Sequence, residues 1–257
     1  MLYRHILSTA VFLPFILFSL AYGQDGQGGQ DGQDGWGDLS LTDDPEDVAP
    51  AIKVIIDPGH GGRDLGARSP KHILEKNIIL KLSKLIQQRL SGNENIDAIP
   101  TRSEDRDITV LERIKFANSS RGDLFIGLHA DGGMGPRAHP IKLFICEYGQ
   151  NELNKKTAEE IDSVWSSLNY PFKEQNLALA RVIKRELEKT GAGREIEVES
   201  SDKLLLGGLS MPAVLIEPID LSNPADEIRL ENEVYITKIS DAIAVAVEVY
   251  LQNAGKL

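Results

Sequence analysis

From residue 51 onward, short apolar runs alternate with longer stretches in which apolar residues recur every three or four positions. The short runs predict β-strands, and the longer spacing predicts amphipathic helices. Strands are expected at residues 54–56, 96–100, 124–128, 141–145, 195–199 and 213–216, and helices at 75–90, 109–117, 174–189 and from 226 to about 251. This alternation predicts a single α/β domain over residues 51–257, with a mainly parallel twisted sheet and helices on both faces.

The N-terminal segment follows a different pattern. Residues 1–23 include the basic residue Arg4 near the start, continue with an apolar run over 6–20 and end in small residues at Ala21 and Gly23. This is the layout of a secretory signal peptide. The apolar run is shorter than the roughly 20 residues of a spanning helix, which favours a cleaved signal over a retained membrane anchor. We therefore expect a periplasmic or secreted protein with no stable membrane span after cleavage.

Residues 24–50 form an acidic segment rich in Gly, Gln and Asp. It contains eight acidic residues and no Lys or Arg. Such a composition offers too little apolar surface to offset the entropy of ordering, so we expect a disordered linker. The linker carries −8 of the formal charge of −11, and residues 51–257 carry only −4. No basic cluster marks the domain, so no nucleic-acid partner is expected.

Cys146 is the single cysteine of the chain, so no intrachain disulfide can form. It follows the apolar run at 141–145, where a small buried side chain that fills the core is expected.

Three of the expected strands lead to a residue that can bind a metal or transfer a proton. His60 follows the first strand after a glycine-rich turn, His129 directly follows the third, and Glu217 directly follows the last. In open α/β sheets, ligands bind outside the carboxyl ends of the strands. We therefore expect these three side chains to converge.

Glu75, the first residue of the helix at 75–90, adds a third candidate metal ligand to His60 and His129. Two histidines and one glutamate match a catalytic zinc site, in which three protein ligands leave a position for water. Glu217 is then the carboxylate available as general base. The prediction is a hydrolase with one Zn²⁺ bound by His60, Glu75 and His129, and with Glu217 as the catalytic residue.

Taken singly, these residues have plainer interpretations. His60 fits an exposed turn residue, Glu75 an acid favoured by the dipole at a helix N-terminus, and His129 a core histidine bonded to the backbone. A carboxylate at Glu217 is costly to bury unless a cation or metal lies beside it. His72, in a polar loop close to Glu75, is a rival metal ligand.

Six short segments, in this order, cover nearly all of residues 52–251. They are Ile56-Asp57-Pro58-Gly59-His60-Gly61-Gly62, Glu75-Lys76-Asn77, Thr101-Arg102, Leu111-Glu112-Arg113 with Ala117-Asn118, Asp123-Leu124-Phe125-Ile126 to His129-Ala130, and Pro212-Ala213-Val214-Leu215-Ile216-Glu217 with Leu221-Ser222-Asn223. Together they resemble the zinc-dependent N-acetylmuramoyl-L-alanine amidases of bacterial cell walls, the type used in daughter-cell separation and sporulation. Any one segment is a weak signal, whereas six in the order of the family are specific.

The resemblance implies roles for particular residues. His60, Glu75 and His129 match the zinc ligands of the family, and Glu217 matches its catalytic glutamate. It also implies the substrate, which is the amide between the lactyl group of N-acetylmuramic acid and the L-alanine of the stem peptide in peptidoglycan. Some septal members carry an inserted helix that plugs the zinc site until a partner protein moves it. A helix expected at 154–169 lies near that position, although a plain packing helix is the simpler interpretation.

The chain departs from the family at several positions. Pro218-Ile219-Asp220 replaces the usual Leu-Gly-Phe after the catalytic glutamate, Gly207 stands where Arg or Lys is usual, and Gly127 replaces a serine. No ligand is lost, and the effect of these departures on substrate binding and specificity stays open. Two alternatives stay open beside the amidase: a non-catalytic peptidoglycan-binding or regulatory module with the same fold, and a zinc hydrolase of another amide. An activator protein is a further partner to consider.

Overall fold

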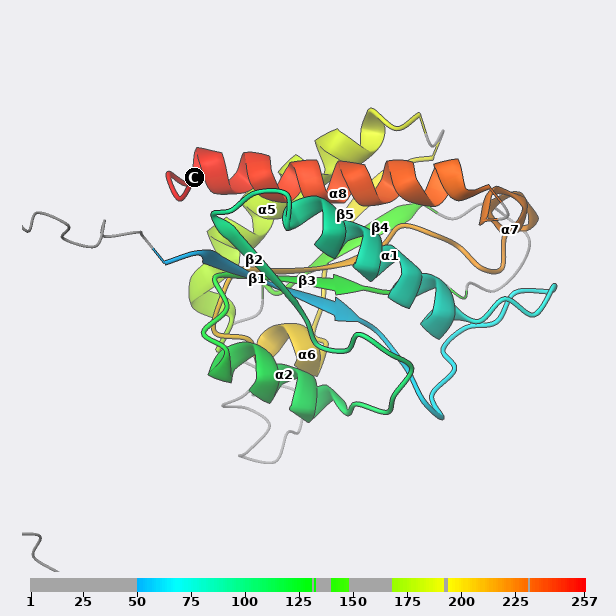
Figure 1. Ribbon diagram of the computed structural model, residues 1–257, viewed down its shortest axis with the longest axis horizontal. Helices are drawn as coiled ribbons and strands as arrows, with labels where there is room; N and C mark the ends of the chain where they lie inside the picture. Colours follow the sequence, from blue (N-terminus) through cyan, green and yellow to red (C-terminus); the bar gives the residue numbers. More distant parts are fainter. Residues whose placement is uncertain (1–49, 131, 133–139, 148–167, 192–193, 231) are drawn as a thin grey trace, which may run out of the picture. The chain divides into compact units, whose positions relative to one another are not determined.

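The computed structural model describes residues 50–130, 132, 140–147, 168–191, 194–230 and 232–257 (Figure 1). These residues belong to one compact unit that spans Ala49–Leu257. The expected signal peptide at 1–23 lies outside the described residues, as do all but the last residue of the linker at 24–50 and the candidate helix at 154–169 up to residue 167.

The described strands form one six-stranded sheet in the order β2-β1-β3-β6-β4-β5. Every neighbouring pair is parallel except β4 with β6, so the predicted mainly parallel sheet is confirmed. The predicted strand at 195–199 is also confirmed as β5, which lies at one edge of the sheet. The bounds are β1 Ile52–Pro58, β2 Ile96–Pro100, β3 Leu124–Leu128, β4 Ile141–Ile145, β5 Ile196–Ser200 and β6 Ala213–Glu217.

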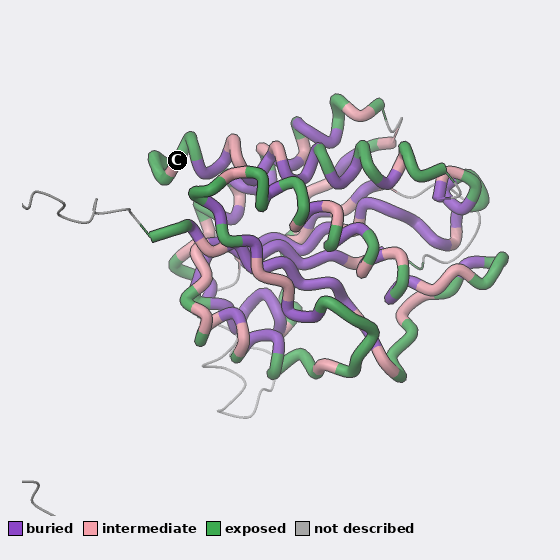
Figure 2. The backbone as a smooth tube through the Cα atoms, in the orientation of Figure 1, coloured by how far each residue is buried: buried purple, intermediate pink, exposed green. Residues whose placement is uncertain are grey.

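Helices cover both faces of the sheet, as predicted (Figure 1). The larger apolar core lies between the sheet and α1, α5 and α8, and a smaller one lies between the sheet and α2 and α6. The described helices are α1 Glu75–Leu90, α2 Val110–Ser119, η1 Tyr170–Phe172, α5 Lys173–Glu188, α6 Leu204–Gly207, α7 Pro224–Leu230 and α8 Glu233–Asn253. Strands β1 and β3 are buried along most of their length (Figure 2) because both of their faces are covered.

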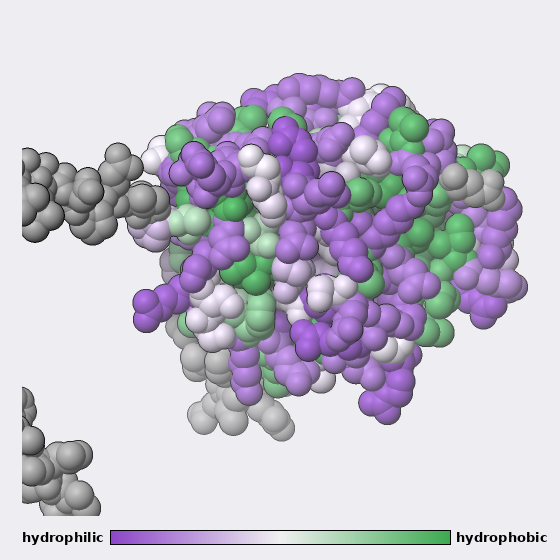
Figure 3. Space-filling view, in the orientation of Figure 1, coloured by the Kyte–Doolittle hydropathy of each residue, from purple (hydrophilic) through white to green (hydrophobic). Residues whose placement is uncertain are grey.

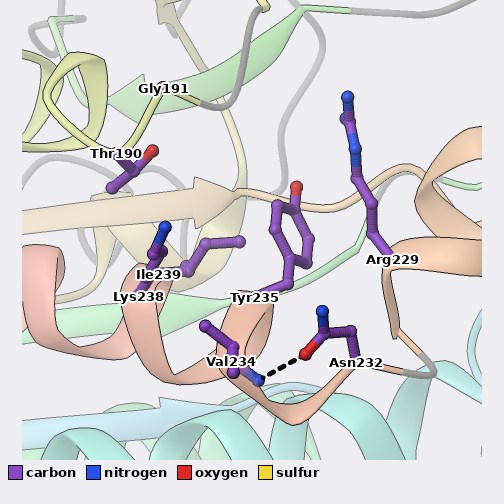
Figure 4. Close-up of a pocket in the computed structure, with 8 residues that line it drawn as sticks. All are labelled: Thr190, Gly191, Arg229, Asn232, Val234, Tyr235, Lys238 and Ile239. Atoms are coloured by element: carbon purple, nitrogen blue, oxygen red, sulfur yellow. Dashed lines mark hydrogen bonds between the residues drawn. The ribbon is translucent and has the colours of Figure 1, made fainter.

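Local capping explains where two helices begin. Helix α2 starts one residue after the predicted 109, because Thr109 and Glu112 form a capping box. The helical stretch expected from 226 is divided into α7 and α8, and the side chain of Asn232 accepts a hydrogen bond from the Val234 N–H (2.9 Å) at the start of α8. Figure 4 shows this cap beside a cavity of about 230 Å³ near the end of α5.

The hydropathy of the surface and the burial of Cys146 are those expected of a chain that buries its apolar residues within one unit. The face seen in Figure 3 is mainly hydrophilic, with smaller hydrophobic areas. Cys146 is 2% exposed, which confirms the predicted buried position. No helix in the described part of the chain combines the length and the apolar character needed to cross a membrane.

The register of the central strands places the functional residues. Pro58 at the end of β1 pairs with Leu128 of β3, and Leu128 pairs with Ile216 of β6. Three parallel strands therefore end side by side. His60 and His129, which follow β1 and β3, and Glu217, the last residue of β6, therefore lie at the same end of the sheet.

Candidate metal centre

His60 lies in the tight turn that follows β1. Its backbone has a φ of 56°, in the left-handed region that residues other than glycine rarely adopt. On one side, its Nδ1 lies 2.9 Å from Oδ2 of Asp64. On the other, its Nε2 lies 3.1 Å from Oε1 of Glu75. The imidazole is thus held between two carboxylates, with Nε2 directed at the buried one.

Glu75 is the first residue of α1, and its side chain is 3% exposed. Its Oε2 accepts a hydrogen bond from the N–H of Ala67 (2.7 Å), and its Oε1 accepts one from the N–H of Ala130 (2.8 Å). A glutamate that served only the helix dipole would point to solvent at the helix end. Here the carboxylate points inward, toward both histidines.

His129 directly follows β3, and its Nδ1 lies 3.2 Å from Oε1 of Glu75. The rings of His60 and His129 are T-shaped, with centroids 4.8 Å apart. One ligand atom from each of His60, Glu75 and His129 lies within 4.8 Å of the other two. The structure therefore brings together the three residues that the sequence analysis selected. The rival His72 is exposed, lies next to Arg68 and is not part of this group.

The close packing of these groups shifts the pKa values of Glu75 and His60. Burial alone would raise the pKa of Glu75, but hydrogen bonds with His129, with His60 and with two backbone N–H groups hold that pKa well below its ordinary range. Burial alone would lower the pKa of His60, but Glu75 and Asp64 raise it above 6.5. Glu75 is therefore a carboxylate at neutral pH, as a metal ligand must be.

Two glycines make room for the cluster. A Cβ atom at Gly59 would lie 2.4 Å from Cε1 of His129, which is closer than real Cβ atoms approach. Gly66 has a φ of +65°, and a Cβ there would lie 2.5 Å from Oε2 of Glu75. The glycines of the turn thus allow the backbone to approach the cluster closely.

Two buried arginines, which the sequence analysis did not select, hold the turn after β1. Arg102 donates to the carbonyl oxygens of Pro58 (2.9 Å) and Gly59 (2.7 Å). Arg113 donates to the carbonyl oxygen of His60 (2.8 Å) and to Oδ1 of the buried Asp57 (2.6 Å). Both arginines lie in the segments that carry the family resemblance. Their role was not visible in the sequence because most of their partners are backbone carbonyls.

Glu217 ends β6 next to His129. The N–H of His129 donates to the carbonyl oxygen of Ile216 (2.9 Å), so the two strand ends are hydrogen-bonded neighbours. Both Glu217 and His129 line a cavity of about 340 Å³. Glu217 is not one of the three residues in the compact His/Glu/His group. Glu217 is instead the acidic residue at the end of β6, the strand next to β3, and it lies beside the His60, Glu75 and His129 cluster.

Four residues that depart from the family pattern, Gly207 and Pro218 to Asp220, are not among the residues that line this cavity. Pro218, Ile219 and Asp220 are buried. Asp220 instead shapes the next turn, where it accepts hydrogen bonds from the N–H and hydroxyl of Ser222 (2.9 and 2.6 Å). Gly207 is the last residue of α6, and Lys203, one helical turn earlier, lines the cavity. A cation is therefore present at the N-cap of this short helix.

The fold and the cluster define an α/β protein with a candidate metal centre at the carboxyl ends of its parallel strands. Residues 54–249 match the family described as N-acetylmuramoyl-L-alanine amidase, and the chain belongs to that family. This result confirms the family expected from the sequence. The predicted enzyme is confirmed at the level of the family: an amidase that hydrolyses the bond between N-acetylmuramic acid and L-alanine in peptidoglycan.

Individual relatives agree with this assignment. The chain is 28% identical over 218 residues to N-acetylmuramoyl-L-alanine amidase AmiA of Escherichia coli (strain K12), a match that covers 77% of this chain and 75% of the relative. The fold resembles that of N-acetylmuramoyl-L-alanine amidase AmiC2 of Nostoc punctiforme, with a TM-score of 0.64, 24% identity and coverage of 78% and 97%. It also resembles the CwlD amidase from Clostridioides difficile, solved in complex with the GerS lipoprotein, with a TM-score of 0.63, 22% identity and coverage of 79% and 99%.

Proposed function

We propose that this amidase is a zinc enzyme in which His60, Glu75 and His129 bind one Zn²⁺ and Glu217 is the catalytic acid and base. The observation that carries the proposal is the convergence of three ligand atoms to within 4.8 Å of one another. These atoms come from three segments that are far apart in the sequence.

The chemistry of the donor set supports zinc. Two imidazoles and one carboxylate form one of the known three-ligand sets of catalytic zinc, which leaves a fourth position for water. Asp64 lies against Nδ1 of His60, an arrangement that orients the ring and leaves Nε2 for the metal. The backbone N–H groups of Ala67 and Ala130 orient the carboxylate of Glu75 in the same way.

Each protein group then has a definite task. Zinc, when bound, supplies an acidified water and polarises the carbonyl of the amide. Glu217 accepts the proton of the attacking water and passes it to the nitrogen of the departing L-alanine. Proton transfer by a positioned side chain of this kind contributes about 10²–10⁴-fold in rate.

We also propose that the protein is exported and acts in cell-wall remodelling, including daughter-cell separation. The signal-like residues 1–23 and the acidic linker at 24–50 support a periplasmic or secreted catalytic domain at 51–257. An activator protein is part of this proposal. It is supported by the CwlD amidase, which resembles this chain in fold and was solved in complex with a lipoprotein.

The test combines metal analysis with product analysis. Purified protein should contain about one zinc ion per chain and should release free stem peptide from muropeptides. A chelator should abolish the release, and added zinc should restore it. Zinc binding without release from any muropeptide would favour the non-catalytic module, and turnover of a different amide would favour another hydrolase. Activity that persists without metal would refute the zinc assignment.

A further inference from the structure

The cavity beside the candidate metal centre has a chemical character of its own. It has a volume of about 340 Å³ and is lined by Val110, His129, Lys203, Leu204, Leu205, Leu215 and Glu217. The cavity wall includes His129, a proposed metal ligand, and Glu217, the proposed catalytic residue. A group held in the cavity therefore lies next to the bond that is cut.

The wall of the cavity is mostly aliphatic. Leu215 of β6 is 2% exposed and Leu205 of α6 is 6% exposed, so they form firm packed walls, whereas Val110 of α2 is 42% exposed and lies at the rim. None of the described lining residues has a hydroxyl or amide side chain. A sugar placed here would bury hydroxyl groups against leucines without hydrogen-bond partners, which is costly. A peptide with small aliphatic groups fits this wall better than the glycan strand does.

Lys203 adds a positive charge to this aliphatic wall. Its Nζ lies 5.3 Å from the centroid of the Phe144 ring. Phe144 of β4 pairs with Leu215 in the antiparallel register, so the two side chains share one face of the sheet. Within the part of the chain that the structure describes, Lys203 has no salt bridge to a carboxylate. An ammonium group over an aromatic ring and without an acidic partner is suited to bind an anion.

We propose that this cavity binds the start of the stem peptide, and that Lys203 pairs with a free carboxylate on the residue after L-alanine. The proposal rests on the proposed amidase function. The methyl group of L-alanine lies against the leucine wall while its amide nitrogen faces His129 and Glu217. The next residue then reaches Lys203. Lys203 is thereby a specificity residue that distinguishes stem peptides with a free carboxylate from those in which this group is amidated.

The experiment measures the activity of each zinc-loaded protein on two substrates. The substrates are two muropeptides that are identical except that the α-carboxyl group of the second peptide residue is free in one and amidated in the other. The variants are Lys203→Met, which removes the charge, and Lys203→Arg, which keeps it. Lys115→Met serves as a matched control, because Lys115 is an exposed lysine of α2 that does not line the cavity.

The wild-type enzyme should prefer the free carboxylate in kcat/KM, and Lys203→Met should reduce this preference about tenfold, mainly through KM. Lys203→Arg should retain most of the preference, and Lys115→Met should retain all of it. The role of Lys203 would be overturned if Lys203→Met lowered kcat/KM equally on both substrates, or if the wild-type enzyme cut both equally. Either result would leave the proposed amidase function standing. If the wild-type enzyme cut neither substrate, the proposed function itself would fail, and this inference with it.

Discussion

Arg113 donates a hydrogen bond from Nη2 to the carbonyl oxygen of His60 at 2.8 Å. The same guanidinium donates to Oδ1 of Asp57 (2.6 Å) and to the carbonyl oxygen of Pro58 (2.8 Å). His60 has a left-handed backbone conformation, which is costly for a residue with a side chain unless its surroundings hold it. Arg113 of α2 is one of the groups that hold it. The position of the first imidazole therefore depends on a helix 53 residues further along the chain.

Replacing Arg113 tests this dependence. Arg113 and Asp57 are 4% and 0% exposed, so Arg113→Gln leaves a buried carboxylate without its cationic partner. The free energy of unfolding should fall by about 3–5 kcal/mol, as measured by denaturant titration. Zinc affinity, measured by competition with a chelator, should fall about tenfold or more because the ligand loop is less well held.

Arg63→Gln is the matched control for this prediction. Arg63 forms an ion pair with Asp107, but its side chain is 94% exposed, so its loss should change stability and zinc affinity little. If the Arg113 and Arg63 variants behaved alike, the buried arginine would not be what holds the turn.

Glu217→Gln separates proton transfer from metal binding. The amide keeps the shape of the side chain but cannot accept the proton of the attacking water. We expect kcat to fall about 10²–10⁴-fold while the zinc content stays at the wild-type level. His129→Ala, in contrast, should empty the site. Loss of zinc from the Glu217→Gln variant would show that Glu217 is a ligand, and the roles would have to be reassigned.

Gly59→Ala tests the close approach between the turn and the second histidine. The added methyl group would lie 2.4 Å from Cε1 and 2.5 Å from Nε2 of His129, so the ring must move. Zinc affinity should fall about tenfold to a hundredfold, as it does when groups that orient a ligand are lost. Gly92→Ala is the control, because its Cβ would meet only the carbonyl oxygen of Arg89 at 3.3 Å. An unchanged zinc affinity in Gly59→Ala would contradict the geometry described here.

The raised pKa of His60 predicts how zinc binding depends on pH. In the metal-free protein, Glu75 and Asp64 stabilise the protonated ring, so this proton must leave before the nitrogen can bind metal. Zinc affinity should therefore weaken as the pH falls through a value above 6.5, by about tenfold per pH unit for one released proton. Asp64→Asn should move this transition to lower pH, because one of the groups that raise the pKa is gone. Titrations with zinc at a series of pH values measure both effects, and identical curves for the two proteins would refute the role of Asp64.

Several elements could be predicted from the sequence because their signals are local. The helix at 75–90 has apolar residues at helical spacing and begins at the same residue, Glu75, in the structure. The capping box of Thr109 and Glu112 is also a local signal, although the predicted helix start was one residue early. Helix α6, Leu204–Gly207, was not predicted, because four residues are too few to show a helical period.

The sequence was enough to predict the sheet, the family and the three residues that converge. The signals were the order of the apolar runs, the residues at their ends and the six family-like segments. Each of these follows from short-range pattern or from the geometry of parallel strands. The tertiary structure alone decided how the cluster is held. Asp64 against His60, the two arginines on the turn and Lys203 in the cavity are contacts between side chains and backbone or cavity groups. Such contacts leave no periodic signal, because they depend on how loops from distant parts of the chain fold over the same sheet edge.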